Sequence, residues 1–403
     1  MPDKTQTLEF VISIDSSPAQ VYDALTNPVV VPMWIGDVVE SDPKKEGRFY
    51  IWWRTGYYTA GHYIHLEEDS KLVFSWHGLE EPHPTQVTIS MTGDEQQSSL
   101  TLTHSQIGVG EPWEKIVATF NQEWPAALDN LKSVVETGID RRLYDMPMSG
   151  ILVSRLVTPE LAEKHTFPVD FGIQLSGVAQ GMAAEAAGLQ KDDILVRIGA
   201  SELRSFEDYN AAMRAHKPGD TLPVEYARGQ QIENTQIELS ARPIPELPAT
   251  ALEFAAELRQ LYAQYSRQLE AIFAGVSQEQ ASYRPGHKEW SAKETLAHLL
   301  LTERWVHFVI LTALAGKPRA KFGENDLNLL TALAGAYPTI SDLLTEFQRA
   351  QDITIAAVEG IPAGFMRSKP RSHMLSHLLL KELLYHSQDH FDQIEAAILA
   401  ASE

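Results

Sequence analysis

Residues 385–394 of this 403-residue chain read YHSQDHFDQI and contain two histidines, His386 and His390, four positions apart. Because residues at this spacing lie on the same face of a helix about one turn apart, their two imidazoles can converge on one ion. A third histidine, His298, follows an expected helix start at Ser291 in the stretch WSAKETLAHL. We therefore interpret the three histidines as candidate ligands of one metal ion.

Helical patterns extend outward from both stretches, and strand patterns end before residue 250. Ser291 with Glu294 three positions later has the spacing of a capping box, which marks the beginning of a helix. Breaks in the helical pattern fall at SYRPGHKEW, in the GKPRAKFGEN region and at EGIPAGFMRSKP. The sequence predicts four main helices, at residues 250–274, 290–315, 339–358 and 372–400. Helices of this length joined by modest loops predict an all-α four-helix bundle.

The last predicted helix contains a second histidine pair with the same spacing, His373 and His377. His386 comes nine residues after His377, and at about 100° per residue the two side chains face opposite sides of an α-helix. We therefore expect His373 and His377 at the surface or at the helix start. His307, nine positions after His298, is excluded from the site by the same count. An isolated HxxxH pair is more often solvated or buried in a core than bound to metal.

The available donors restrict the choice of metal. The chain has no cysteine, so a metal ion must bind to His, Asp or Glu side chains. Three histidines with the remaining coordination positions open to water are typical of catalytic zinc, although nickel, manganese and iron also accept imidazole. We expect a divalent metal ion, with zinc as the first choice. Glu303 and Tyr385 are candidates for acid–base groups or for groups that support the ligands, but a glutamate on a helix face is usually solvated, so neither is included in the predicted site.

The histidines belong to a longer pattern, in which a tryptophan–serine pair begins the second helix and HxxxHxxQI lies in the last helix. The residues of this pattern are Trp290, Ser291, Glu294, His298, His386, His390, Gln393 and Ile394. By them, residues 249–403 resemble the DinB-like superfamily. The resemblance implies a four-helix bundle in which His298, His386 and His390 hold a divalent metal ion. It also suggests an activity, because the superfamily includes metal-dependent thiol S-transferases that act with low-molecular-weight thiols.

Residues 146–243 contain short strand patterns with small-residue turns, from MSGILVSRLV to KPGDTLPVEYARG. This segment resembles the PDZ domains of HtrA-type bacterial proteases, but we find no GxSxG or comparable serine motif with it and infer no protease. By the resemblance, the backbone amides of Gly150, Ile151 and Leu152 bind the C-terminal carboxylate of a peptide, and the following strand pairs with that peptide. Asp192-Asp193 stands where the family commonly has Gly-Asp, which Asp tolerates because it accepts left-handed backbone conformations. The alternative is a spacer with an unused groove.

Residues 1–142 alternate like short strands in LEFVISI, GRFYIWW, AGHYIHLE, KLVFSW, QVTISMT and SSLTLTH, which predicts a curved antiparallel sheet. Helices are predicted in SPAQVYDALTN and WEKIVATFNQEWPAALDNLKSVVE. The segment resembles the START-like (SRPBCC) helix-grip superfamily, and within it the homologues of the activator of heat-shock-protein ATPase. The matching residues are SSPAQVYDALTNP, Trp34, the EGRF turn, Gly61, the KLVFSW strand and Trp124. Such folds can leave an apolar cavity between sheet and helix. Candidate lining residues are Trp34, Trp53, Trp76 and Trp124, with Trp113 as a fifth, although each could simply fill the core.

The composition limits the partners. A formal net charge of −21 repels phosphate backbones and anionic lipid surfaces, so we expect neither nucleic acid nor membrane as a partner. No window approaches about eighteen unbroken apolar residues, and the N-terminus lacks the pattern of a secretory signal, so we expect a cytoplasmic protein. The proline-rich stretch RPIPELPAT predicts a short stiff linker before the bundle.

The sequence therefore predicts a multidomain α+β protein with a helix-grip α/β domain, a β-rich PDZ domain and an all-α bundle. The leading hypothesis is metal-dependent thiol transfer or hydrolysis at the three histidines, with a small apolar ligand bound by the first domain. The alternative is a non-catalytic, stress-related scaffold with a structural metal, whose PDZ groove recruits C-terminal peptides. Open coordination positions favour the enzyme, whereas a central peptide-binding module favours the scaffold.

Overall fold

The computed structural model describes residues 4–179, 181–242, 244, 246–287, 289–317 and 326–402. The chain forms two compact units, Met1–Ile139 with Glu246–Glu403, and Asp140–Pro245. The domain boundaries at 142, 146, 243 and 249 stay predictions. Two prolines of the predicted linker, Pro243 and Pro245, lie outside the described residues, as do residues 318–325 in the predicted break of the bundle.

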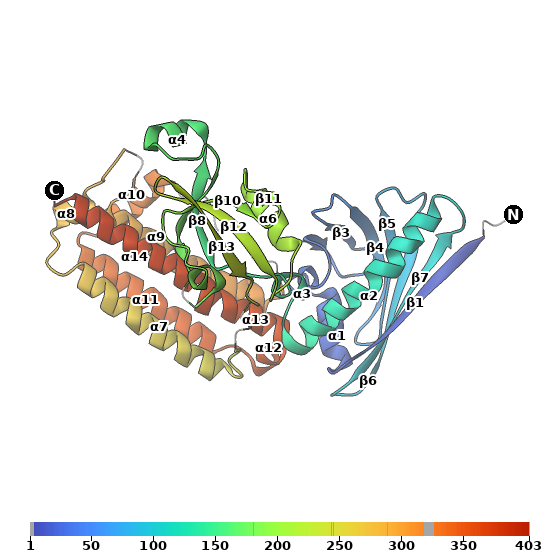
Figure 1. Cartoon of the computed structure of the whole chain (residues 1–403). Helices are drawn as coiled ribbons and strands as arrows, with labels where there is room; N and C mark the ends of the chain where they lie inside the picture. Colours follow the sequence, from blue (N-terminus) through green and yellow to red (C-terminus); the bar gives the residue numbers. More distant parts are fainter. Residues whose placement is uncertain are drawn as a thin grey trace. The chain divides into compact units, whose positions relative to one another are not determined.

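The first domain is an antiparallel sheet with a long helix along it (Figure 1). Its strands are β1 (Thr5–Ile14), β2 (Val38–Ser41), β3 (Arg48–Trp52), β4 (Tyr58–Glu67), β5 (Lys71–Gly78), β6 (Thr85–Gly93) and β7 (Ser98–Gly108), in the order β1-β7-β6-β5-β4-β3-β2. The short helix α1 (Pro18–Thr26) begins at the N-cap Ser17, and α2 (Trp113–Thr137) runs through Pro125. This architecture confirms the predicted helix-grip fold.

Alternation along the strands determines which side chains form the core of this domain. In β6 the buried residues Val87, Ile89 and Met91 alternate with partly exposed ones. They belong to the same apolar cluster as Leu128 and Leu131 of α2, which recur at helical spacing. The helix therefore packs with one apolar stripe against the inner face of the sheet.

The second unit is a small β-rich domain, as the PDZ resemblance predicts. Its strands are β8 (Ile151–Val157), β9 (Gly172–Val178), β10 (Ile194–Ile198), β11 (Ser201–Glu202), β12 (Thr221–Arg228) and β13 (Gln231–Glu238), in the order β13-β12-β10-β9-β8, with β11 on β10. Its helices are α4 (Pro159–His165), α5 (Ala183–Ala186) and α6 (Phe206–Arg214), and α3 (Arg141–Tyr144) precedes β8.

Asp192 has a φ of 70°, the left-handed conformation expected of it. Asp193 accepts two hydrogen bonds from Arg228, at 2.8 and 2.7 Å, which tie this turn to β12.

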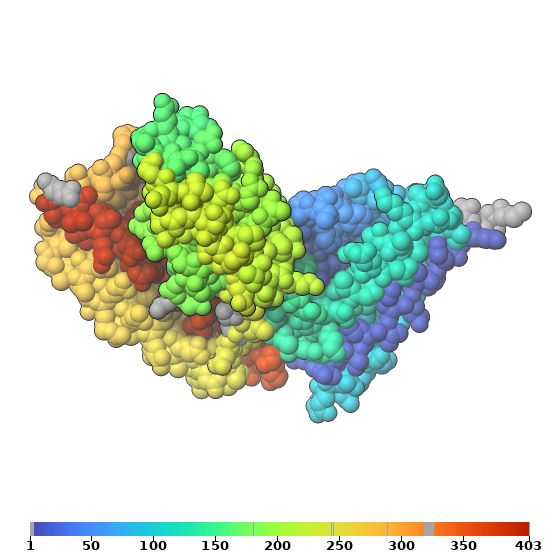
Figure 2. Space-filling view, in the orientation of Figure 1, coloured from blue at the N-terminus to red at the C-terminus, as the bar shows by residue number. Residues whose placement is uncertain are grey.

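The described part of residues 246–402 is helical, as predicted. The main helices are α7 (Ala251–Ile272), α9 (Ala292–Leu314), α11 (Ile340–Glu359) and a last stretch divided into α13 (Lys369–His377), a π-helical segment (Leu378–Glu382) and α14 (Leu383–Ala400). Short helices α8 (Gln278–Ser282), α10 (Leu327–Gly335) and α12 (Ala363–Arg367) lie between them. In the space-filling view, side chains fill the space between the helices of the bundle (Figure 2). The π-helical segment was not predicted.

Helix α9 is the most apolar of the long helices of the bundle. Among the described residues it is the one helix whose length and composition would allow it to cross a membrane. However, 61% of the stretch concerned is buried inside the structure, which is also the property of a core helix. Phe254 of α7 and Phe391 of α14 belong to the same buried cluster as α9 and have no exposed surface.

A buried carboxylate fixes the beginning of α9. Ser291 caps the helix, and Glu294 completes the predicted capping box. Glu294 also binds Arg284 through two hydrogen bonds and accepts a third, at 2.7 Å, from Thr331 of α10. Burial disfavours the charged form of Glu294, but these hydrogen bonds outweigh it and lower its pKa to about 2.

We predict that Glu294→Gln destabilises the bundle in a pH-dependent way. Because the folded-state pKa is lowered, the carboxylate stabilises the protein above the unfolded-state pKa, and this stabilisation is lost as the pH falls towards about 2. The variant should lose roughly 2–3 kcal/mol of unfolding free energy at pH 7 and little near pH 2. Urea unfolding followed by far-UV circular dichroism measures both values. Glu279→Gln, at an exposed position in the first turn of α8, is the control; equal stability of both variants at every pH would contradict the assignment.

Candidate metal centre

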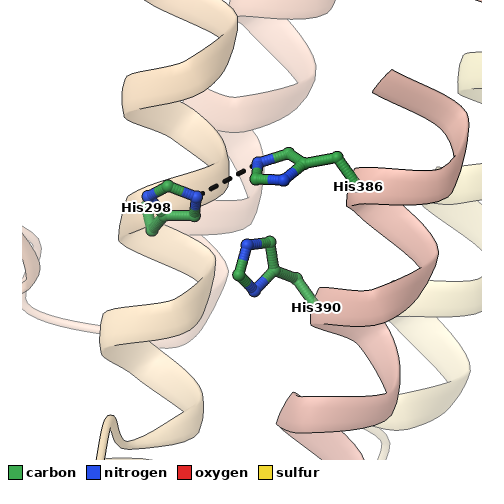
Figure 3. Close-up of side chains that lie close together, drawn as sticks. All are labelled: His298, His386 and His390. Carbon is green, nitrogen blue, oxygen red and sulfur yellow. Dashed lines mark hydrogen bonds between the residues drawn. The ribbon is translucent and has the colours of Figure 1, made fainter. Parts of the chain in front are cut away.

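The three predicted ligands come together between two helices of the bundle. His298 lies on α9, and His386 and His390 lie one turn apart on α14 (Figure 3). The Nε2 atoms of His298 and His386 are 3.1 Å apart, and one donor atom from each of the three side chains lies within 4.8 Å of the others. These separations bring three imidazole nitrogens within reach of a single ion.

The protonation of His390 fits a metal ligand. Its Nδ1 is 2.9 Å from Oε1 of Gln393, one turn further along α14. A carboxamide oxygen only accepts hydrogen bonds, so Nδ1 carries the proton and Nε2 has a free lone pair for a metal ion. Gln393 is the glutamine of the HxxxHxxQI motif. In the structure its contact with His390 orients that imidazole.

The imidazoles of α14 are held in the neutral form that binds metal. Burial lowers the pKa of His386 to about 4, and the neighbouring His390 adds to this effect. Burial also lowers the pKa of His390. His298 is almost completely buried, with 1% of its surface exposed, whereas His386 and His390 are partly exposed. The cluster therefore has a closed side towards α9 and an accessible side at α14.

An aromatic side chain covers one edge of the cluster. The Trp290 ring stacks on His390, with 5.9 Å between ring centroids and 22° between ring planes, and its centroid is 5.1 Å from that of His298. Trp290 immediately precedes the N-cap of α9, so the helix start also positions this ring. The tryptophan limits the access of water and gives an apolar surface next to the histidines.

The second histidine pair lies outside the cluster. His377 is half-exposed, but His373 is buried with 5% of its surface exposed, so a surface position was wrong for His373. The π-helical segment separates α13 from α14, so the count from His377 to His386 along one regular helix does not apply. His307, which the sequence excluded, contacts the Ala350 carbonyl oxygen through its Nε2, away from the cluster.

The two nearby polar residues differ in burial. Tyr385 is 71% exposed, whereas Glu303 is 5% exposed. The expectation that Glu303 is solvated was wrong, because Tyr262 of α7 and Thr354 of α11 enclose its carboxyl group and donate hydrogen bonds to it. A signal was present in the sequence: the glutamate lies within LLLTERWVHFVI, which is apolar on several sides of the helix.

The first domain encloses a small apolar cavity of about 30 Å³. Trp34, Trp76 and Trp124 line it, whereas Trp53 and Trp113 do not. The Nε1 atoms of the three lining tryptophans donate hydrogen bonds to the Ala24 carbonyl, Glu81 and His104, respectively. A cavity of this size holds about one water molecule, so a larger apolar ligand would require side chains to move.

The predicted peptide-binding loop lies at the beginning of the edge strand β8. Gly150 has a φ of 77°, and a Cβ atom there would lie 2.4 Å from Cβ of Met182, so the position requires glycine. Leu152 is 49% exposed. The amide of Ile151 donates to Oγ of Ser149 at 3.1 Å, and that hydroxyl lies 2.6 Å from the Tyr209 hydroxyl of α6. One of the three predicted carboxylate-binding amides is therefore hydrogen-bonded within the protein.

Comparison with known families gives three separate matches. Residues 15–136 match the family of activator of Hsp90 ATPase homolog 1-like proteins, residues 155–239 match the PDZ domain, and residues 260–394 match the DinB superfamily. The chain thus contains an activator-type SRPBCC domain, a PDZ domain and a DinB domain, in this order. This confirms the three predicted resemblances.

Individual relatives cover parts of the chain. A serine protease Do-like HtrA from Lactococcus lactis is 28% identical over 89 residues, which are 22% of this chain and 22% of that protease. The chain thus spans about a fifth of the length of this relative. Similar solved structures include an Aha1 dimer from Colwellia psychrerythraea (20% identity, 32% of this chain, 96% of that chain, TM-score 0.30). Another is an HSP90 activator from Plasmodium falciparum (20% identity, 32% of this chain, 94% of that chain, TM-score 0.28).

We predict that the protein binds about one divalent ion per chain and that each of His298→Ala, His386→Ala and His390→Ala reduces this content severely. Losing one of three imidazoles removes a direct metal ligand and leaves two nitrogens, too few for a stable site. Elemental analysis of protein purified without chelators measures the content. His377→Ala, on α13 outside the cluster, is the matched control and should retain the metal; loss from the control alone, or from none of the variants, would contradict the site.

Proposed function

We propose that the DinB domain is a metal-dependent enzyme that transfers a thiol group from a low-molecular-weight thiol to an electrophilic substrate. The observation that supports this proposal most is the three-histidine cluster with one accessible side. Among the described residues, no fourth His, Asp or Glu joins the group of three. A three-nitrogen set of this kind is typical of catalytic rather than structural zinc, because coordination positions remain for water or substrate.

A divalent ion at this site would supply Lewis acidity and lower the pKa of a bound thiol or water towards neutrality. The residues of the chain have separate tasks around it. His298, His386 and His390 would hold the ion, and Gln393 fixes the tautomer of His390. Trp290 offers an apolar face on which the carbon part of a substrate can pack, and it restricts water at that edge.

The SRPBCC fold suggests that the first domain binds a small apolar ligand, for which the side chains around its cavity of about 30 Å³ would have to move. Its cavity is lined almost entirely by apolar side chains, with Ser41 as the polar exception. The PDZ domain suggests peptide binding, and the exposed Leu152 on an edge strand is consistent with it. However, a peptide carboxylate would have to compete with Ser149 for the Ile151 amide. We therefore prefer the enzyme over the alternative of a scaffold that recruits peptide tails.

Transfer can be tested with zinc-loaded protein, L-cysteine as the thiol and monochlorobimane as the electrophile. In this reaction a carbon–sulfur bond forms and chloride leaves, which gives a fluorescent product. We predict saturable acceleration by the wild type, and a fall to the uncatalysed rate in His386→Ala because the variant lacks a metal ligand. His377→Ala should react like the wild type.

The outcomes separate the alternatives. Acceleration that is insensitive to His386→Ala would contradict catalysis at this site. A metal-loaded wild type that is inactive with thiols but hydrolyses activated esters would replace thiol transfer by hydrolysis at the same histidines. Metal binding without either reaction would favour a structural ion and hence the scaffold.

A further inference from the structure

A carboxyl group lies in the interior of the bundle without an ionic partner. Glu303 of α9 is 5% exposed, and among the described residues no Lys, Arg or His forms an ion pair with it. Its Oε1 accepts hydrogen bonds from the hydroxyl groups of Tyr262, at 2.9 Å, and of Thr354. No hydrogen bond from the described residues reaches its Oε2. Burying a carboxyl group in this way costs free energy that an apolar side chain would not cost, so a function of Glu303 is worth seeking.

Glu303 lines a small polar cavity of about 10 Å³ between α7, α9, α11 and α14. The other polar lining residues are Tyr262, Tyr265, Thr302, Gln351 and Ser387. Nε2 of Gln351 is buried and has no hydrogen-bond partner among the described residues, whereas the buried Tyr265 hydroxyl meets Ser387. Because buried polar groups are nearly always satisfied, often by internal water, a cavity of this size and lining fits one water molecule.

The same cavity borders the three-histidine cluster. Thr302 lines it, and the Oγ1 atom of Thr302 is 3.4 Å from Nε2 of His386. Ser387, on the opposite wall, directly follows His386 on α14. Thr302, whose hydroxyl also donates a hydrogen bond to the His298 carbonyl oxygen at 3.1 Å, therefore lies between the cavity of Glu303 and His386.

We propose that Glu303 is a buried proton carrier for the three-histidine site, connected to it through Thr302 and a water molecule in the shared cavity. This inference rests on the proposed thiol chemistry. When a thiol binds at the histidines, its S–H bond breaks and the electron pair stays on sulfur. The proton passes along the water to Oε2 of Glu303, where an O–H bond forms. The carboxylate and thiol become a carboxylic acid and a thiolate. After the thiolate has formed the carbon–sulfur bond, the proton passes from Glu303 to the leaving group or the solvent, which restores the carboxylate.

The surroundings of Glu303 suit a group that changes its protonation state. Burial raises its pKa, whereas the hydrogen bonds from Thr354 and Tyr262 lower it, with a net rise. The titratable groups around it are Tyr262 and Tyr265 on α7, His307 one turn along α9, and His386 across Thr302 on α14. From α11 the cavity and the carboxyl group meet Phe347, Gln351 and Thr354, none of which carries a charge. A net rise, without an adjacent cation, brings the pKa of a carboxyl group closer to neutral pH. Proton carriers work best when their pKa is near the working pH.

The experiment counts the protons released when 2-mercaptoethanol binds to the zinc-loaded full-length protein. Isothermal titration calorimetry in two buffers of different ionisation enthalpy gives this number at each pH. In the wild type Glu303 takes up the thiol proton, so few protons reach the solvent. Glu303→Gln preserves the shape and the hydrogen bonds but cannot take up a proton, so it should release about one proton more per thiol. This difference should be present above the folded-state pKa of Glu303 and disappear below it, where the carboxyl group is already protonated.

Thr354→Val is the matched control, because it removes a hydrogen bond to Glu303 and keeps the carboxyl group. The variant should still take up the proton. Because the lost hydrogen bond lowers the pKa of Glu303, the pH range over which the carboxylate takes up the proton should shift upward. Equal proton release by the wild type and Glu303→Gln, with thiol binding intact, would overturn the carrier role alone. Equal increases in Glu303→Gln and Thr354→Val at every pH would also overturn it, because both would then report a structural disturbance. Absence of thiol binding to the wild type would remove the proposed function and this inference together.

Discussion

The convergence of three imidazoles depends on the register of two helices, α9 and α14. The register of α9 is set at its beginning, where Ser291 caps the helix and the buried Glu294 ties it to Arg284. The register of α14 is set by the π-helical segment Leu378–Glu382 directly before it. A rotation of either helix by one residue, about 100°, would move a histidine out of the cluster. The three-histidine cluster is thus a consequence of how two helix starts are fixed.

Once this register is set, the environment of the histidines follows. Packing of α9 in the middle of the bundle buries His298, and the N-cap places Trp290 beside His390. Burial also keeps the imidazoles of α14 uncharged by lowering their pKa, which favours a cation as their partner. The cavity that contains Glu303 shares Thr302 with this environment, so binding at the histidines and proton exchange inside the bundle are connected through one side chain.

Local patterns predicted the fold and the three histidines that come together. Tertiary packing determined which other polar side chains are buried and which side chains line the cavities. His386 and His390 could be paired from their spacing, because a helix places such residues on one face. The apolar stretch around Glu303 indicated that this glutamate is buried, but its partners Tyr262 and Thr354 come from helices that no local pattern connects to α9. The buried position of His373 was missed because no spacing rule shows where a helix changes to π geometry. Trp53 does not line the cavity of the first domain, since strand alternation alone does not say where a sheet leaves space.

Zinc K-edge X-ray absorption of the zinc-loaded protein tests the central claim, a three-histidine ion with open positions, most directly. The account predicts three imidazole nitrogens at about 2.0–2.1 Å and one or two oxygen atoms from exchangeable water. Addition of 2-mercaptoethanol should replace an oxygen by sulfur at about 2.3 Å. A fourth protein ligand that thiol does not displace would contradict the account and make the ion structural.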